Sequence, residues 1–369
     1  MAKNVNRIKK RTDPRFFVND VIQDYLRGSR VQKLSPTTRK EYEEELSVFA
    51  KWCSNNAIIQ KDKRWMAVNA VGDLEPIQLH QINDQVIHLF LEYLRKTHKP
   101  RKSAANELSS YTLSSYVRVI RGFLNWCLMD DQYCEQVKAI TVQRIQKPKI
   151  ISTIIETFSS EHIAALFEAC NNEESEHLQV RDRAILSLLL DTGIRATELI
   201  TLTIGNVNLD AKDPYVRVFG KGSKWGEVGL GEQARRNIQR YIRMFREPTI
   251  ENEIEQQYSN LPSRQVKQIV KQVLPRALVI VNRNGDKLTC SGLWRIIDRL
   301  GKWADIEGVR CSPHTFRHTF AAMFIRNGGD IYTLSKLLRH SSVKVTEEYL
   351  KSLQQSEARR GARSVLDNL

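Results

Sequence analysis

Four short motifs in the C-terminal half of the chain contain residues that could cleave a phosphodiester. They are Thr192–Leu199, Gly220–Gly222, Pro313–His318, and His340–Ser342 followed by a tyrosine. The candidates within them, in chain order, are Arg195, Lys221, His314, Arg317, His340 and Tyr349. Each residue alone has an ordinary structural interpretation, such as a helical ion pair or a packed aromatic ring, and it is their joint occurrence that indicates a reactive site.

The chemistry of phosphate explains these residue types. Negative charge builds on the non-bridging oxygens of a phosphodiester as a nucleophile attacks. Guanidinium groups bind such oxygens through paired hydrogen bonds and stay charged at any working pH, which fits Arg195 and Arg317. Tyr349 fits the nucleophile, because a phenol attacks well when a positive field or a base helps to remove its proton. Lys221 could protonate the leaving sugar oxygen.

Two local patterns would position these residues. Ser312 and Pro313 are typical of a helix start, so His314 and Arg317 should share one face near a helix N-terminus, where an anion is favoured. Gly328–Gly329 should end that helix. The segments 216–219 and 227–230 predict two short strands around a lysine-bearing hairpin tip at 220–224.

With these motifs the chain resembles the tyrosine recombinase, or phage integrase, family. The specific resemblance covers about 158–350, and its motif residues are the six candidates named above. The resemblance implies a 3′-phosphotyrosyl intermediate, a free 5′-hydroxyl that later attacks the partner strand, and no requirement for ATP, metal or another cofactor. It also implies a mainly α fold, in which a helical core-binding domain and an α-rich catalytic domain with a small antiparallel β-hairpin form a C-shaped DNA clamp.

The chain departs from the family pattern at three positions. Arg339 precedes His340 where the family usually has glycine, which adds bulk and charge beside the site. This arginine could alter local packing or add a phosphate contact. Trp225 and Gly226 stand where the hairpin usually has a basic residue. Asn206 stands where aspartate is common, and we expect this to affect loop structure alone. None of these departures removes a reacting group.

Composition supports a nucleic-acid partner independently of the motifs. The 369 residues contain 57 Lys and Arg against 42 Asp and Glu, a formal net charge of +15. Such a chain should bind polyanions in a salt-dependent way, although many other basic proteins share this balance. A basic, polar N-terminus, the lack of a long apolar run and six scattered cysteines predict a cytoplasmic protein with no membrane partner.

The pattern along the chain predicts five segments. Residues 1–13 form a flexible basic arm, 14–142 an all-helical DNA-binding domain, and 143–158 a linker around Gln146–Lys149. The catalytic domain follows at 159–353, and 354–369 is a basic tail that could dock on a neighbouring subunit, as it does in relatives. Helices are expected from Ser35 to about 52, at 82–96 and 110–127 in the first domain, and after Ser159, at 183–190 and at 291–303 in the second.

Several basic residues are candidate DNA contacts, although a solvated helix face is their more common role. They are Arg39, Lys40, Arg118 and Arg121 in the first domain and Lys224, Arg295 and Arg299 in the second, where Lys302 should also face outward. A zinc site at Cys311, His314 and His318 is disfavoured, because no further ligand lies at a convincing spacing.

Three functional hypotheses follow. The first is a site-specific recombinase that integrates, excises, transposes or resolves a DNA element. The second is a type IB topoisomerase-like enzyme with the same cleavage chemistry, and the third is a non-catalytic DNA-binding protein. The complete set of reacting groups argues against the third, and the helical first domain and basic tail favour the first. The expected partners are double-stranded DNA, further copies of the chain in a tetramer, and accessory DNA-bending proteins.

Overall fold

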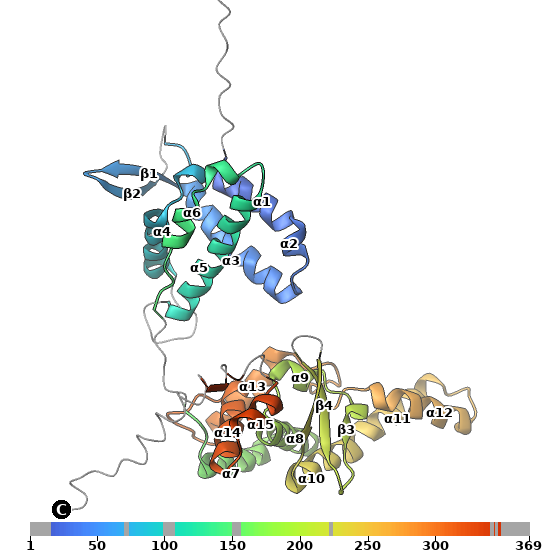
Figure 1. The fold of residues 1–369 in the computed structure, drawn as a ribbon. Coiled ribbons are helices and arrows are strands. Elements are labelled where there is room, and N and C mark those ends of the chain that lie inside the picture. Colours follow the sequence, from blue (N-terminus) through green and yellow to red (C-terminus); the bar gives the residue numbers. More distant parts are fainter. Residues whose placement is uncertain are drawn as a thin grey trace, which may run out of the picture. The chain divides into compact units, whose positions relative to one another are not determined.

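The computed structural model describes residues 16–69, 74–98, 108–149, 156–220 and 224–339, together with 343, 346 and 347. The chain divides into two compact units, Met1–Ile151 and Ser152–Leu369 (Figure 1). The division lies within the expected linker 143–158, while the finer boundaries at 13 and 353 stay predictions. A mainly helical chain with small antiparallel sheets was expected, and this fold class is confirmed.

The first unit is built from helices and one two-stranded sheet. The helices begin after side-chain caps where the sequence offers them, as at Ser35, Asn83 and Ser109, whose oxygens accept backbone N–H groups of the first turn. The elements are α1 Val18–Arg27, α2 Ser29–Gln32, α3 Pro36–Asn55, β1 Asn56–Lys61, β2 Arg64–Asn69, η1 Leu79–Gln81, α4 Asp84–Thr97, α5 Ser110–Met129, η2 Cys134–Gln136 and α6 Ala139–Arg144.

Aromatic rings hold the core of the first unit together. Phe49 and Trp52 from α3 lie against Phe90 of α4, with ring centroids 4.9 and 5.4 Å from the Phe90 ring. Tyr25 of α1 lies 5.6 Å from Phe123 of α5. Such contacts bury large apolar surfaces and so fix the packing of four helices.

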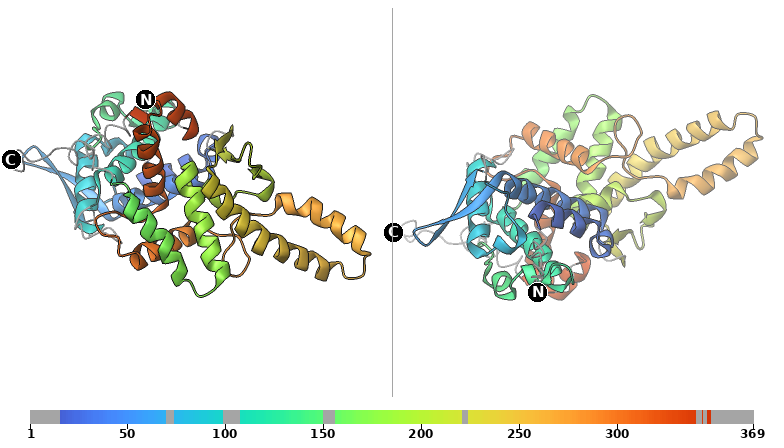
Figure 2. Two further views of the ribbon diagram at one scale, coloured as in Figure 1. Left: turned by 90° about the horizontal axis from the view of Figure 1, so that it is seen from below. Right: turned by 90° about the horizontal axis from the view of Figure 1, so that it is seen from above.

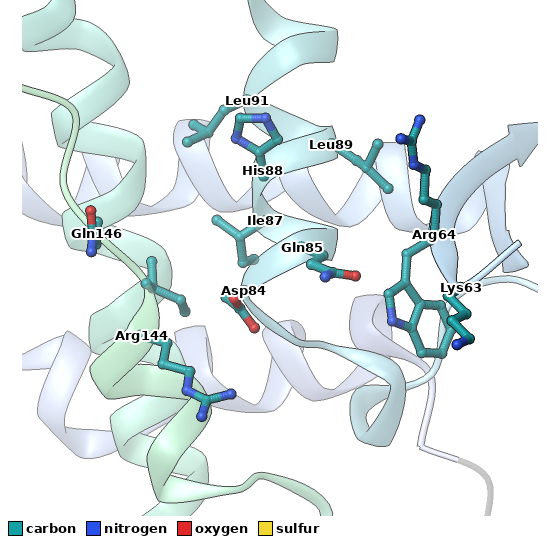
Figure 3. A pocket seen from close by; sticks show the side chains of 12 residues that line it. Lys63, Arg64, Asp84, Gln85, Ile87, His88, Leu89, Leu91, Arg144 and Gln146 are labelled. Carbon is teal, nitrogen blue, oxygen red and sulfur yellow. The ribbon is translucent and has the colours of Figure 1, made fainter. Parts of the chain in front are cut away.

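The expectation that this domain is all-helical is wrong, because β1 and β2 form an antiparallel hairpin between α3 and α4. Asp62 and Lys63 at its turn have φ of 49° and 62°, the left-handed geometry that closes a tight hairpin. The hairpin, α4 and α6 border a cavity of about 540 Å³. Figure 3 shows Lys63 and Arg64 on one side of this cavity and Arg144 on the other.

The second unit combines nine α-helices with a three-stranded antiparallel sheet, in the order β3-β4-β5, among its described residues. Its elements are α7 Ser160–Ala169, η3 Cys170–Asn172, α8 Glu176–Thr192, α9 Ala196–Ile200, η4 Ile204–Asn206, β3 Val207–Asn208, β4 Tyr215–Gly220, β5 Lys224–Gly229, α10 Glu232–Tyr241, the π-helix η5 Ile242–Arg246, α11 Glu247–Gln257, α12 Ser263–Val273, η6 Leu274–Arg276, α13 Cys290–Trp303, α14 Pro313–Arg326 and α15 Ile331–Leu337.

Helix α8 is the central element of the second unit. It packs against α10 and α14, and Leu186, Leu188 and Leu189 are completely buried. In contrast, α11 and α12 form a two-helix extension that projects from the rest of this unit (Figure 2). The extension has its own small core, which includes Ile250, Ile254, Val266 and Val270.

The helix start and the strand pairing predicted around the candidate site are confirmed, while most of the hairpin tip at 220–224 lies outside the described residues. Helix α14 begins at Pro313, and the Ser312 hydroxyl accepts the Thr315 N–H at 3.3 Å. Strands β4 and β5 form the expected hairpin, with Val218 opposite Gly226. All six cysteines are free thiols. In the described parts of the chain, none of the helices has the length and apolar character to cross a membrane.

Gly193, at the C-terminus of α8, provides a test of this packing. Its φ is +55°, and an added Cβ would lie 2.5 Å from Cδ1 of Phe320. We expect Gly193→Ala to lower the free energy of unfolding by about 2 to 4 kcal/mol, from backbone strain and overpacking together. Urea denaturation of the purified protein measures this change.

Gly285 supplies the matched control. Its φ is +86°, but nothing lies within 4 Å of an added Cβ, so Gly285→Ala should show the backbone strain alone, about 1 kcal/mol. Equal losses in the two variants would show that the Phe320 ring does not constrain this position.

Candidate active site

Arg195 lies directly after the end of α8, in the turn that leads into α9. The left-handed Gly193 ends α8, and its N–H donates to the Leu189 carbonyl at 3.1 Å. Arg195 then occupies the N-cap of α9, where its N–H donates to Oε2 of Glu198 at 2.7 Å. Its Nη1 donates to Oε1 of the same carboxylate at 2.9 Å, so both the backbone and the side chain of Arg195 are fixed.

Arg317 is buried on α14 and is held by backbone carbonyls. Its Nη1 donates to the Gly193 oxygen at 2.7 Å, and its Nη2 donates to the Leu338 oxygen. Its exposed fraction is 7%. These two carbonyl acceptors orient the guanidinium, because each of them fixes one of its terminal nitrogens.

The two arginines are attached to the same two segments of the chain. Arg195 belongs to the turn that contains Gly193, and its Nη2 donates to the Arg339 carbonyl at 3.3 Å. Arg317 bonds to Gly193 in that turn and to Leu338 in the other segment. The structure therefore brings together two guanidiniums that are 122 positions apart in sequence.

Glu198 and Arg339 complete this cluster. Glu198 is 3% exposed, and Nη2 of Arg339 donates to its Oε2 at 2.7 Å. Burial alone would raise the pKa of the Glu198 carboxyl, but the Arg195 N–H and the charge of Arg339 outweigh burial and hold that pKa below its ordinary value. The carboxylate therefore stays ionised between two arginines.

The two histidines on α14 are kept neutral. The His314 side chain is exposed at the surface but partly surrounded by protein, and this partial burial, followed by the charges of Arg317, Arg195 and Arg310, lowers the pKa of its imidazole. Burial, with the charges of His314 and Arg317, lowers the pKa of His318 to about 4. Since Arg195 and Arg317 both act on His314, it belongs to the same electrostatic cluster.

The other three candidates, Lys221, His340 and Tyr349, lie outside the described residues. The described chain reaches Gly220 at the end of β4 and resumes at Lys224 in β5. Beyond Arg339, only 343, 346 and 347 are described. Their roles, like those of the arginines, remain predictions.

Two candidate DNA contacts in the second unit differ in their surroundings. Arg295 of α13 is exposed, whereas Arg299 bonds to the buried Glu173 and lies 3.5 Å from Oδ2 of Asp182. The Arg299 guanidinium is also 5.1 Å from the centre of the Trp303 ring. Lys302, expected to face outward, is exposed and pairs with Asp298 at 2.9 Å. Of Lys224 only the backbone, in β5, is described.

The candidates in the first unit lie on α3 and α5. Arg118 of α5 bonds to Glu41 of α3 at 2.7 Å, and Arg39 bonds to Gln32 at 2.9 Å. Lys40 is exposed and lies 3.8 Å from Glu44. Arg121 is partly buried on α5, one turn after Arg118. Exposed ion pairs contribute little stability, so Arg118 and Lys40 could exchange their partners for phosphates at low cost.

Sequence reasoning missed the way in which the arginines are supported. It treated the spacing of Arg195 and Glu198 as an ordinary ion pair that competes with a chemical role, but the pair forms part of the cluster. It did not predict Glu198 as a partner of Arg339, although Arg339 is the second cation on this carboxylate. The glycine expected at 339 was a usable signal, because it indicates a left-handed backbone, and Arg339 has φ of +53°. Across the described residues, no group of three His, Cys, Asp or Glu could hold a metal ion.

Comparison with known proteins places the chain in a family. The sequence model of the phage integrase family matches residues 156–356, more than half of the chain. The chain is 27% identical to the tyrosine recombinase XerD of Staphylococcus epidermidis, over 90% of this chain and 94% of that protein.

Solved structures share the fold at lower identity. The XerH site-specific recombinase bound to palindromic difH substrate, in a post-cleavage complex, aligns with a TM-score of 0.62 and 17% identity over 92% of this chain and 84% of that chain. A lambda integrase tetramer bound to a Holliday junction aligns with a TM-score of 0.60 and 11% identity over 91% of this chain and 78% of that chain.

His318 gives a pH-dependent test of the cluster. The unfolded histidine binds a proton below about pH 6.5, but the folded one resists protonation down to about pH 4, so the free energy of unfolding should fall as the pH falls through this window. We expect His318→Gln to lose less stability than the wild type between pH 7.5 and 5, by about 1 to 2 kcal/mol. Urea denaturation at the two pH values measures the difference.

The difference between the wild type and His318→Gln cancels the contribution of other groups that titrate in the same pH range. Burial raises the pKa of Asp182. The protonated carboxyl therefore stabilises the fold at low pH, and this stabilisation is lost as the pH rises, equally in the wild type and in His318→Gln. An identical pH-dependent loss in wild type and variant would show that His318 is not held neutral.

Proposed function

The chain belongs to the phage integrase family and is a tyrosine-type site-specific DNA recombinase, and from this premise we propose that Tyr349 cleaves a DNA strand at a phosphate held by Arg195 and Arg317. The observation that carries this proposal is the attachment of both arginines to the turn at Gly193 and to the segment Leu338–Arg339. Two guanidiniums fixed in this way present several N–H donors to the non-bridging oxygens of one phosphate.

The proposed reaction is a balanced transfer of the phosphoryl group. The Tyr349 oxygen forms a bond to phosphorus while the bond from phosphorus to the 5′-oxygen breaks, which leaves a 3′-phosphotyrosyl link. Negative charge on the non-bridging oxygens increases at the transition state, and Arg195 and Arg317 stabilise it there. A free 5′-hydroxyl from the partner strand then attacks the link and releases Tyr349.

The protons are assigned to the remaining members of the predicted set. The leaving 5′-oxygen takes a proton from Lys221. The phenol proton of Tyr349 passes to a neutral imidazole, and the lowered pKa of His314 supports this role because it keeps the ring able to accept. We propose that His340 donates a hydrogen bond to the same phosphate.

The substrate and the assembly follow from the family. We propose that the two units bind double-stranded DNA as the two sides of a clamp and that four copies act on two duplexes, which the tetramer of lambda integrase on a Holliday junction supports. The net charge of +15 supports DNA as the partner. The choice between integration, excision, transposition and resolution, a role for accessory DNA-bending proteins, and action in the cytoplasm remain predictions.

A topoisomerase-like activity is the second candidate, because it shares the cleavage step. The two functions differ in the strand that attacks the phosphotyrosyl link. Recombination between two cognate sites on one plasmid changes the order of its DNA segments, whereas relaxation removes supercoils from any plasmid. Relaxation of plasmids that lack a cognate site, without exchange between sites, would favour the topoisomerase-like activity.

Covalent trapping tests the nucleophile. On a nicked suicide duplex that contains a cognate site, we expect the wild-type protein to form a protein–DNA adduct without added magnesium, since the cations of the site are arginine and lysine side chains. Tyr349→Phe should form none, because it lacks the attacking oxygen. Denaturing gel electrophoresis of the labelled duplex measures the adduct.

The controls separate chemistry from binding. Tyr349→Phe should bind the duplex as well as the wild type in a gel shift, since a single hydroxyl is removed. Replacement of the exposed Tyr332, as Tyr332→Phe, is the matched control and should leave adduct formation unchanged. An adduct in Tyr349→Phe would assign the nucleophile to another residue.

Removal of the C-terminal tail tests the proposed assembly. We expect a chain that ends at Leu353 to lose synapsis of two sites while keeping most of its binding to one site, because the tail is proposed to contact a neighbouring subunit. Gel-shift titration resolves single-site and paired complexes. Equal loss of both complexes would assign the tail to DNA binding instead.

A further inference from the structure

Arg339 has a backbone conformation that is unfavourable for arginine. Its φ is +53°, and its N–H donates to the Lys336 carbonyl at 3.0 Å, just after the end of α15. Glycine accepts this left-handed geometry without strain, but a residue with a side chain does not. An arginine here needs interactions of its side chain that offset the strain.

The Arg339 side chain makes such interactions with a buried carboxylate. Its Nη2 lies 2.7 Å from Oε2 of Glu198 and its Nε 3.4 Å from Oε1, while Nη1 donates to the Leu337 carbonyl at 2.8 Å. The exposed fractions of the Arg339 and Glu198 side chains are 12% and 2%. Hydrogen bonds between charged groups are strong in such a water-poor setting.

The same carboxylate also holds Arg195, so the three charges form one unit. Arg195 binds both oxygens of Glu198, and it donates to the Arg339 carbonyl as well. Arg195 and Glu198 alone would sum to zero charge beside the phosphate. With Arg339 the sum is +1, so Arg339 offsets the carboxylate and leaves the field of Arg195 available to an anion.

Arg339 also touches the hairpin strand β5. A Cβ added to Gly226 would lie 2.6 Å from Cδ of Arg339 and 3.1 Å from its Cγ. The aliphatic part of Arg339 therefore lies directly against the Gly226 backbone, with no room for a larger residue. Gly226 and Arg339 are two positions at which the chain departs from the family pattern, and these departures are in contact.

We propose that Arg339 is a positioning residue that joins strand β5 to Arg195 through Glu198, and that Gly226 makes the space for it. Arg339 thereby sets both the orientation and the net charge of the arginine that binds the phosphate. It also links Arg195 to the hairpin whose tip contains Lys221 in the sequence. This inference rests on the proposed function of Arg195.

The first experiment uses Arg339→Gly, which removes the side chain and suits the left-handed backbone. Single-turnover cleavage of a suicide duplex at saturating protein should slow by about 10- to 100-fold, the effect of losing a partner that orients a reacting group. The dissociation constant from gel shifts should change by less than about threefold, because Arg339 is not proposed to touch DNA. Arg283→Gly, which removes an exposed arginine paired with Glu174, is the matched control and should change neither quantity.

The second experiment separates positioning from a merely structural role. Glu198→Gln in the Arg339→Gly background removes the carboxylate charge that Arg339 offset, so the double variant should cleave faster than Arg339→Gly alone. Arg339→Lys, which keeps the charge but not the paired hydrogen bonds, should cleave at an intermediate rate. A structural role would give no gain in the double variant.

The third experiment addresses the contact with β5. Gly226→Ala should slow cleavage when Arg339 is present, because the added methyl displaces its side chain, and should have no effect in the Arg339→Gly background. Should Arg339→Gly fail to fold, as judged by thermal unfolding, Arg339→Lys and Gly226→Ala still test the proposal.

Two results would overturn the inference. One is cleavage by Arg339→Gly at the wild-type rate, and the other is a loss of cleavage that matches the loss of DNA binding and is not relieved by Glu198→Gln. Both require a wild-type protein that forms the Tyr349 adduct. Absence of that adduct in the wild type contradicts the proposed function itself, so the two failures can be told apart.

Discussion

The candidate site depends on one buried carboxylate that balances two guanidiniums. A site for a phosphodiester must gather positive charge, but like charges in a water-poor environment repel one another strongly. Glu198 relieves this repulsion between Arg195 and Arg339 and stays ionised, because their charges and hydrogen bonds outweigh its burial. Because two cations share one anion, the cluster keeps a net positive charge. A single arginine paired with this carboxylate would be well oriented but electrically neutral.

Backbone carbonyls provide the second means of holding cations without cancelling them. Arg317 donates to Gly193 at the end of α8 and to Leu338 at the end of α15, two positions where carbonyl groups lack partners within their own helices. The negative ends of two helix dipoles therefore meet at this guanidinium. Because α8 is buried on most sides, the Gly193 carbonyl has a fixed position and so has Arg317. The two carbonyl bonds therefore tie the orientation of Arg317 to the way in which α8 and α15 end.

Local signals in the sequence predicted the elements that position the site, but not the contacts between them. Ser312 and Pro313 predicted the start of α14, because capping depends on neighbouring residues, and the apolar run at 183–190 predicted the helix before Arg195. The bond from Arg317 to Gly193 joins positions 124 apart, and the bond from Arg339 to Glu198 joins positions 141 apart. No periodicity specifies such partners. The β1–β2 hairpin was missed for a related reason, because its turn, Asp62–Lys63, lacks glycine and asparagine, which usually mark a left-handed turn.

The same positive cluster that would bind a phosphate also controls its neighbouring histidine. Partial burial, together with the charges of Arg317 and Arg195, lowers the pKa of His314, so the unliganded site contains charged arginines beside an imidazole that resists protonation. A phosphate bound between the arginines would offset their charge, and the pKa of His314 would then rise towards its ordinary value. An imidazole of this kind accepts a proton more readily when DNA is present than when it is absent. Binding of the substrate anion would thus increase the basicity of a group that lies beside it, without any movement of the backbone.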